Sequence, residues 1–133
     1  DKNKLLIKEG REALLFEQKI APQKGDTARE LVGLPAYAGK VIGQAQVLKS
    51  VTEMKKFKKG SILVASNTTP DWLPIMKKAK AILTEKGGIT SHAAIVSREL
   101  KIPCIVGIKG ITLIVKNGDR LSVDAREGIV KIM

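Results

Sequence analysis

The sequence predicts an α/β domain with a mixed β-sheet. Its 133 residues, of which 44% are hydrophobic and 28% charged, match the size and composition of one globular domain. In the middle of the chain, short β-rich runs alternate with segments of helical character, which is the order typical of α/β proteins. Near the C-terminus, two β-rich runs are separated by a short turn and predict a hairpin. Parallel and antiparallel strands should therefore share one sheet.

The first thirty residues differ from the rest of the chain. Residues 3–19 predict a helix, because apolar residues recur at helical spacing among charged ones: Leu6, Ala13, Phe16 and Ile20. Residues 20–30 contain Pro22 and Gly25 among polar side chains, as a linker does, and reach at most about 35 Å when extended. We therefore expect an N-terminal helix and linker over residues 1–30 and the folded domain over residues 31–133.

Strands and one short helix open the predicted domain. Residues 31–39 and the alternating run 41–48 predict strands, with bends or bulges at three glycines: Gly33, Gly39 and Gly43. Ser50 and Glu53 have the spacing of a capping box. They predict a short helix that continues to Phe57 and ends before Gly60.

An alternation of strands and helices follows. Pro70 suits the first turn of a helix over residues 70–78, and Pro103 stops a second helix over residues 91–100. The strands of this region are predicted at residues 61–66, 80–84 and 103–108. A turn at 116–119 then leads into the hairpin, whose strands are predicted at 120–125 and 128–133.

Composition excludes several classes of protein. No apolar stretch approaches the roughly 18 residues needed to cross a bilayer, and the polar N-terminus has no signal-peptide core. Cys104 and His92 are the single cysteine and histidine, so neither an internal disulfide nor a zinc cluster can form. We therefore expect a cytoplasmic domain without a membrane partner that binds no metal or cofactor itself. Because the sequence opens with Asp1 and not with Met, we expect it to be part of a longer protein.

The net charge of +11 raises the question of nucleic-acid binding. Residues 1–66 contain 13 basic and 7 acidic side chains (+6) and residues 67–133 contain 11 and 6 (+5), so the excess is spread along the chain. Two Phe, one Trp and one Tyr are too few for a platform on which bases stack. We therefore expect no nucleic-acid partner. A solvated lysine-rich surface and a surface for acidic or phosphorylated partners remain as alternatives.

The segment LTEKGGITSHAAIVSREL carries the candidate chemistry. Between a strand that ends near residue 84 and a helix that begins near residue 91, Gly87 and Gly88 allow a tight backbone path. Thr90 or Ser91 can cap the helix, and His92 falls in its first turn. Free amide N–H groups and the positive end of the helix dipole favour an anion in front of such a helix. The segment therefore predicts a phosphate site.

The imidazole of His92 can act as a nucleophile toward phosphorus. At neutral pH an ordinary histidine is mostly uncharged, and the positive end of a helix disfavours the imidazolium further. A ring nitrogen then has a free lone pair and, unlike a serine hydroxyl, needs no general base. The hydroxyls of Thr90 and Ser91 and the first amides of the helix can donate hydrogen bonds to the phosphoryl oxygens. The spacing leaves a structural or capping role for His92 open as the alternative.

GGITSHAAIVSREL and the following IPCIVG resemble the phosphohistidine signature of the phosphoenolpyruvate-utilising enzymes. This family includes pyruvate, water dikinase (phosphoenolpyruvate synthase), pyruvate, phosphate dikinase and rifampin phosphotransferase. The resemblance covers about residues 31–133, and TPDWLPIMKKA is most similar to the pyruvate, water dikinase branch. It implies a swivelling β/β/α domain. Two departures leave the subfamily open: Tyr37, Ala38 and Gly39 stand where many members have Ser-Pro-Gly, and Ile89 stands where many have Arg or Met.

The resemblance also implies roles for individual residues. His92 is the catalytic residue that accepts a phosphoryl group on a ring nitrogen, in a phosphate cradle formed by Gly87, Gly88, Thr90 and Ser91. Thr90 matches a threonine that regulatory kinases modify in some members, so it is a possible regulatory residue. A plain capping threonine is the simpler interpretation.

The activity implied by the resemblance is that of a phosphoryl-carrier domain in a phosphotransferase. In the family, an ATP-grasp domain transfers a phosphoryl group from ATP to the histidine. The swivelling domain then delivers it to a second site, where the acceptor is pyruvate in the dikinases and a hydroxyl in rifampin phosphotransferase. Mg and ATP are therefore implied at a partner domain, and an acceptor-binding domain is implied beside it, in cis or in trans.

Two alternatives to a pyruvate-specific carrier remain. One is a carrier with a hydroxyl acceptor, like rifampin phosphotransferase. The other is a binding or regulatory module that has the same fold and is never phosphorylated. In the carrier interpretations residues 20–30 are the natural pivot, and this chain alone is catalytically incomplete.

Other features of the sequence are assigned structural roles. Residues 33–40 resemble a P-loop, but five residues separate the two glycines instead of four, and valine follows the lysine where Ser or Thr is required. Asp71 is expected in the first turn of a helix and Asp124 at a strand end. Arg98 and Glu99 lie about two turns beyond His92, so we expect them at the helix surface or at an interdomain contact. Trp72 and Met76 share a helical face and are expected in the core or at a docking surface.

Overall fold

The computed structural model describes residues 29–133. The helix predicted at 3–19 and residues 20–28 of the predicted linker lie outside this range, and Arg29 and Glu30 begin the first strand. The strands are β1 (Arg29–Val32), β2 (Leu34–Tyr37), β3 (Lys40–Leu48), β4 (Ile62–Ala65), β5 (Ala81–Thr84), β6 (Cys104–Val106), β7 (Arg120–Asp124) and β8 (Ile129–Ile132). The α-helices are α1 (Leu73–Met76), α2 (His92–Leu100) and α3 (Ile111–Ile114), and two 3₁₀-helices are η1 (Val51–Lys56) and η2 (Pro70–Trp72).

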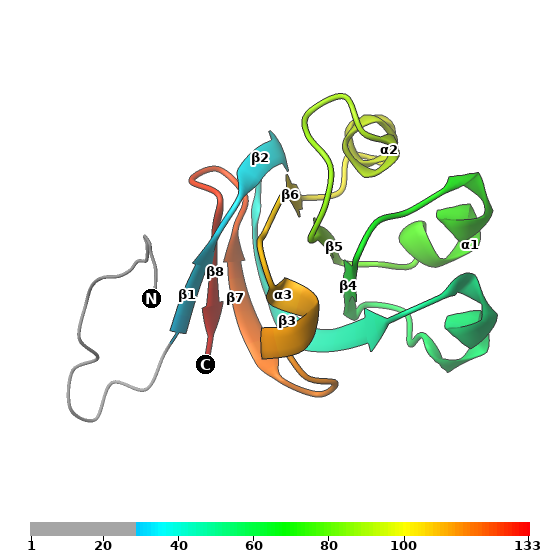
Figure 1. Cartoon of the computed structure of the whole chain (residues 1–133), viewed down its shortest axis with the longest axis horizontal. Coiled ribbons are helices and arrows are strands. Elements are labelled where there is room, and N and C mark those ends of the chain that lie inside the picture. Colours follow the sequence, from blue (N-terminus) through cyan, green and yellow to red (C-terminus); the bar gives the residue numbers. More distant parts are fainter. Residues whose placement is uncertain (1–28) are drawn as a thin grey trace.

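The predicted mixed sheet is confirmed. Its strand order is β1-β8-β7-β3-β4-β5-β6-β2, in which β3, β4, β5 and β6 are parallel and the other neighbours are antiparallel. The long strand β3 joins the two parts, because Lys40–Gln44 pair with β7 and Ala45–Leu48 pair with β4. The consecutive strands β1 and β2 stand at opposite ends of the order, so the sheet curls into a nearly barrel-shaped form (Figure 1).

The connection between β1 and β2 depends on close backbone packing at Gly33. Its N–H donates to the carbonyl oxygen of Gly128 at 2.9 Å, which ties this connection to the C-terminal hairpin. A Cβ at position 33 would lie 2.6 Å from the carbonyl oxygen of Val106, closer than any real contact. The bend expected at Gly33 is therefore present, and no larger residue fits there without movement of the backbone.

Two apolar cores follow from the alternation of side chains along the strands. In β4, Ile62 and Val64 face the inside of the curled sheet, whereas Leu63 and Ala65 face the helices. All four are buried because a parallel strand in this position is covered on both faces. The inner core also holds Ile111 of α3, and the outer core holds Ala93 of α2. Figure 1 shows α1 and α2 on the side of β4–β6 that faces away from β1, β7 and β8.

Two local predictions were wrong in detail, and one short helix was not predicted. The helix predicted at 70–78 is divided into η2 and α1, because Pro74 has no N–H to donate to a carbonyl one turn earlier. The segment after Ser50 forms the 3₁₀-helix η1, and Glu53 accepts a hydrogen bond from the N–H of Lys49 at 2.8 Å and not from Ser50. The short helix α3 was not predicted; it begins after Gly110, whose φ is 76°.

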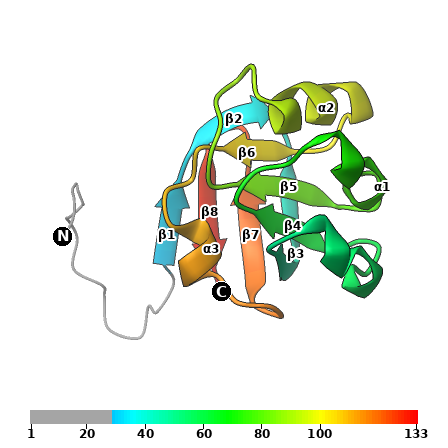
Figure 2. The same cartoon turned by 45° about the vertical axis from the view of Figure 1, so that its right-hand side comes forward.

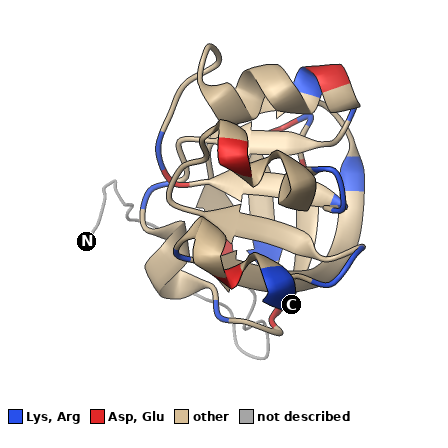
Figure 3. Ribbon diagram, turned by 90° about the vertical axis from the view of Figure 1, so that its right-hand side faces the viewer, with Lys and Arg blue, Asp and Glu red and all other residues tan. Residues whose placement is uncertain are grey.

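The helix at 91–100 and the C-terminal hairpin agree with the sequence analysis. α2 extends over His92–Leu100, and β7 and β8 pair with Asp124 opposite Ile129 (Figure 2). In Figure 3, Lys and Arg positions are distributed over several elements of the ribbon, with fewer Asp and Glu positions among them. Among the helices of residues 29–133, none is long and apolar enough to cross a membrane.

Candidate functional site

The candidate site lies where three parallel strands end. The carboxyl ends of β4, β5 and β6 are neighbours in the sheet, and the loops that follow them meet at this edge. The N–H groups of Glu85 and Lys86 donate to the carbonyl oxygens of Ala65 and Ser66 at 3.0 and 2.9 Å, which continues the pairing beyond the strands. Ligands of open parallel sheets bind at this edge, because the loops and the helix N-termini converge there.

The glycine-rich loop has the tight backbone path that the sequence predicts. Gly87 has a φ of 103°, and a Cβ on it would lie 2.8 Å from the Cβ of Ser91. Both its conformation and its close contact therefore require glycine. A Cβ on Gly88 would meet no atom within 4 Å, so the lack of a side chain at this position leaves open space in front of α2.

Ser91, and not Thr90, caps α2. Its hydroxyl donates to the carbonyl oxygen of Gly88 at 2.7 Å and accepts from the N–H of Ala94 at 3.4 Å. The N–H of Ser91 also donates to the Gly88 carbonyl at 3.0 Å, which closes a turn over the four residues before the helix. Thr90 is exposed on this turn.

His92 is the first residue of α2, and its ring is held from a different loop. Its Nδ1 atom lies 2.8 Å from the hydroxyl oxygen of Thr68, which follows β4 and is only 6% exposed. The hydroxyl contact occupies Nδ1, so the second ring nitrogen, Nε2, is the one available for chemistry. His92 itself is half-buried. The sequence analysis missed Thr68, although its position directly after a strand of the same sheet edge was a usable signal.

Several backbone donors surround the start of α2. Within residues 29–133, the N–H groups of residues 87–90, 92 and 93 have no hydrogen-bond acceptor. Together with the positive end of the dipole of α2, they form a set of donors suited to an anion. The five predicted residues Gly87, Gly88, Thr90, Ser91 and His92 are thus brought together on one loop and helix start.

Two side chains that were not assigned to the site hold its loop in place. Arg98, expected at the helix surface, is exposed but reaches back to donate from Nη2 to the carbonyl oxygen of Ile89 at 2.7 Å. The Glu85 carboxylate accepts from the N–H and the hydroxyl of Thr112 at 3.1 and 2.6 Å, which joins the loop to α3. Glu99 is exposed on the last turn of α2.

Four other singled-out residues have the structural positions expected of them. Asp71 lies in the first turn of η2 and accepts a hydrogen bond from the hydroxyl of Thr69. Asp124 ends β7 and accepts from two backbone N–H groups of the hairpin turn. Trp72 and Met76 are buried in the core beneath the helices.

Cys104 is buried in the same core, behind α2. Burial raises the pKa of its thiol to about 11, and the Ser97 hydroxyl and the positive charge of Arg98 oppose this rise. The thiol is therefore protonated and inert at neutral pH. No group of three potential metal-ligating side chains occurs within residues 29–133.

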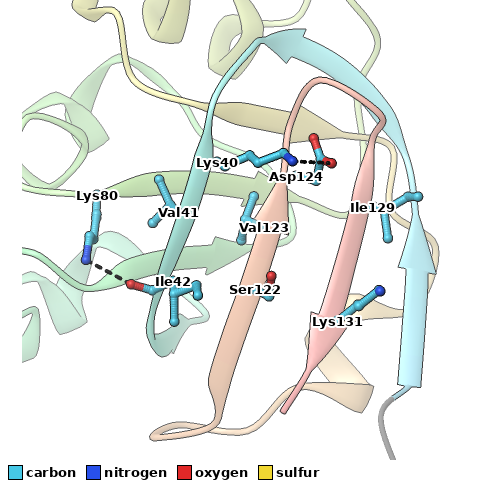
Figure 4. Close-up of a pocket in the computed structure, with 9 residues that line it drawn as sticks. All are labelled: Lys40, Val41, Ile42, Lys80, Ser122, Val123, Asp124, Ile129 and Lys131. Atoms are coloured by element: carbon cyan, nitrogen blue, oxygen red, sulfur yellow. Dashed lines mark hydrogen bonds and ion pairs between the residues drawn. The ribbon is translucent and has the colours of Figure 1, made fainter.

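A groove of about 620 Å³ lies on a different part of the molecule, along β3, β7 and β8 (Figure 4). Lys40 approaches Asp124 at 3.9 Å there, and the ammonium of Lys80 donates to the carbonyl oxygen of Ile42 at 2.8 Å. None of the residues predicted to bind phosphate lines this groove. The groove is therefore separate from the predicted phosphate site at the start of α2.

The fold and the site together define a β/β/α domain that presents one histidine at a helix N-terminus. A family model described as "PEP-utilising enzyme, mobile domain" matches residues 57–128, more than half of the chain. The chain belongs to this family.

Longer relatives agree with this assignment. The "Phosphoenolpyruvate synthase" of Pyrococcus furiosus is 42% identical over 134 residues, covering 98% of this chain and 16% of the relative. The "Probable phosphoenolpyruvate synthase" of Staphylothermus marinus is 51% identical over 100 residues, covering 74% of this chain and 12% of the relative. The chain thus corresponds to less than a fifth of the length of these proteins.

The fold is also present in a solved structure of low sequence similarity. The solution structure of a UPF0107 protein is 24% identical, with a TM-score of 0.61, over 79% of this chain and 99% of that one. This likeness concerns the fold alone.

Proposed function

We propose that this chain is a phosphoryl-carrier domain in which Nε2 of His92 accepts a phosphoryl group and passes it to a second substrate. Membership of the mobile-domain family implies a part in phosphotransfer. The observation that carries the proposal is the position of His92 at the start of α2, with Nδ1 held by Thr68 and free N–H donors around it.

The contact with Thr68 accommodates the reactive tautomer, because a hydroxyl oxygen can accept a hydrogen bond from Nδ1–H. In a neutral imidazole only one ring nitrogen has a proton, so a lone pair on Nε2 requires the proton on Nδ1. The Nδ1–H group then donates to the Thr68 hydroxyl oxygen, 2.8 Å away. When Nε2 attacks phosphorus, the N–P bond forms as the P–O bond to the leaving group breaks, and the ring becomes positively charged. Nδ1–H is then a stronger donor, so Thr68 stabilises the phosphorylated state more than the free one.

The backbone N–H donors are suited to the negative charge of a phosphoryl group attached to the histidine. A phosphoryl group attached to Nε2 has two negative charges at neutral pH and several acceptor oxygens. The N–H groups of the loop and of the first turn of α2, with the hydroxyls of Thr90 and Ser91, can donate to these oxygens. Fixed donors of this kind stabilise charge as it develops, because they need not reorient during the reaction.

The donor and the acceptor of the phosphoryl group belong to sites outside this chain. We infer that ATP, with Mg²⁺ at an ATP-grasp domain, supplies the phosphoryl group, and that pyruvate at a separate acceptor-binding domain receives it. Relatives named phosphoenolpyruvate synthase support this assignment, and this chain spans only 12% to 16% of two of them. The chain alone then carries out half-reactions and completes no cycle.

The test is the appearance of one phosphohistidine. The 133-residue chain is mixed with an ATP-grasp domain of a relative, Mg²⁺ and γ- or β-labelled ATP, and labelled protein is assayed for acid and alkali stability. We expect one acid-labile, alkali-stable phosphate that is absent from His92→Ala and retained in Ser122→Ala, a control on the distant strand β7. Addition of pyruvate together with the acceptor-binding domain of the same relative should discharge the label into phosphoenolpyruvate.

Each alternative has its own result in this experiment. A label that forms but is discharged only by hydroxyl compounds indicates a carrier of the rifampin phosphotransferase type. A folded chain that takes up no label from ATP or from phosphoenolpyruvate contradicts the carrier proposal and favours an unphosphorylated binding module.

A further inference from the structure

We propose that Arg98 is a positioning residue for phosphoryl transfer: it fixes the peptide between Ile89 and Thr90 so that the Thr90 N–H stays available as a phosphate donor. This inference rests on the proposed function. Among the hydrogen bonds within residues 29–133, Arg98 makes none to His92 or to Thr68, which holds the His92 ring. Arg98 therefore affects His92 only through the loop that it contacts.

The peptide in question is the centre of a β-turn. The N–H of Ser91 donates to the carbonyl oxygen of Gly88 at 3.0 Å, so Ile89 and Thr90 are the two central residues. Neither has a positive φ, which excludes the turn type that would require one at Thr90. In a planar trans peptide the C=O and the N–H point in opposite directions, so the orientation of the Ile89 carbonyl also sets that of the Thr90 N–H.

Arg98 holds that carbonyl from the last turn of α2. Its Nη2 atom donates to the Ile89 oxygen at 2.7 Å, a short distance for a charged donor. The approach is natural for this position, because long side chains on a helix lean toward its N-terminus. The guanidinium therefore occupies one face of the turn, and the Thr90 N–H must point to the other face, away from Arg98.

Rotation of this peptide would reverse the electrostatics of the loop. A rotated peptide directs the carbonyl oxygen of Ile89 to the place where the Thr90 N–H now lies. A partial negative charge would then replace a donor and repel a phosphoryl oxygen. Thr90 resists the rotation by itself, because a β-branched residue avoids the positive φ that the rotated turn needs. The bond from Arg98 adds to this resistance and keeps the donor in place before the phosphoryl group arrives.

Arg98 can be tested without a partner domain by using phosphoramidate, a small phosphoryl donor. Its P–N bond breaks as the bond to Nε2 forms, and ammonia leaves. The 133-residue wild-type chain is compared with Arg98→Gln, Arg98→Lys and Lys101→Gln by the rate of phosphohistidine formation. The shift of the Thr90 amide signal on phosphorylation is read from ¹H–¹⁵N spectra. Lys101→Gln is the matched control, because it removes one positive charge from the exposed C-cap of the same helix, three residues beyond Arg98.

For Arg98→Gln we expect phosphorylation to slow by about 3- to 10-fold, the scale of one ordinary intramolecular hydrogen bond, because solvent screens the charge of the exposed guanidinium. The shift of the Thr90 amide on phosphorylation should also decrease, Arg98→Lys should restore part of both readouts, and Lys101→Gln should match wild type. Arg98→Gln with the wild-type rate and the wild-type Thr90 shift would overturn the inference. Failure of the proposed function gives a different result, because the wild-type chain would then take up no label from ATP or from phosphoenolpyruvate in the experiment with the partner domain.

Discussion

Replacement of Thr68 by valine tests whether a hydroxyl from a separate loop controls the reactivity of His92. Valine has nearly the same shape as threonine but cannot accept a hydrogen bond. Thr68 is 6% exposed, so water has little access to replace the lost partner of Nδ1. The 2.8 Å contact is the only hydrogen bond of the His92 ring within residues 29–133. We therefore expect the ring to lose its preference for the Nδ1–H tautomer and for one orientation.

The size of the effect follows from the change in charge on the ring. A neutral hydrogen bond contributes about 1 kcal/mol net, whereas one from a charged donor contributes about 1.5–3 kcal/mol. The difference, roughly 0.5–2 kcal/mol, is the extra stabilisation that Thr68 would give to the phosphorylated ring and to the transition state before it. Because about 1.4 kcal/mol corresponds to a factor of ten, Thr68→Val should slow phosphohistidine formation by about 2- to 30-fold.

The assay compares the two neighbouring threonines. Rates of His92 phosphorylation are measured for Thr68→Val and Thr69→Val, and ¹⁵N spectra of the imidazole report which nitrogen has the proton. Thr69 is the matched control, since it is exposed and its hydroxyl bonds to Asp71. We expect a slower rate and an altered tautomer only for Thr68→Val. An unchanged rate together with an unchanged ring spectrum in Thr68→Val would refute the reasoning.

Two further predictions concern the folded domain. Gly87→Ala should lower the free energy of unfolding by about 1–3 kcal/mol, because its φ of 103° and a Cβ 2.8 Å from Ser91 both oppose a side chain. Thermal unfolding should show a clearly smaller change for Gly88→Ala; equal changes would argue against strain at Gly87. Burial raises the pKa of the Cys104 thiol to about 11, so the unfolded chain loses this proton at a lower pH than the folded one. Stability should therefore decrease as the pH rises from about 9 to about 11, more steeply in wild type than in Cys104→Ala, as measured by urea unfolding; parallel curves would exclude this linkage.

Much of the fold was predictable because its signals are local. The alternation in β3, the four buried residues of β4 and the hairpin β7–β8 are all visible as patterns of neighbouring side chains. The errors concern short helices, whose ends are set by single residues or whose length is too small for a pattern. Pro70 and Pro74 both fit an early helical turn, but Pro74 cannot donate a hydrogen bond, so one predicted helix became η2 and α1. α3 has only four residues, too few for a periodic pattern to be recognised.

In the candidate site, the chain order of residues 87–92 was sufficient to predict a tight loop, a cap and a histidine at the start of a helix. These features depend on φ angles and hydrogen bonds between residues that are close in sequence. The choice between Thr90 and Ser91 as the cap required coordinates, because both have a hydroxyl at a suitable spacing.

Only the tertiary structure decided which ring nitrogen of His92 is held and by what. Thr68 precedes His92 by 24 positions and meets it because β4 and β5 pair in parallel and align the loops at one edge of the sheet. The pairing register of two distant strands depends on how their buried faces pack together, and no residue of the signature around His92 specifies it. The sequence by itself therefore determined the proposed nucleophile and its helix, whereas the assembled sheet determined the partner that orients its ring.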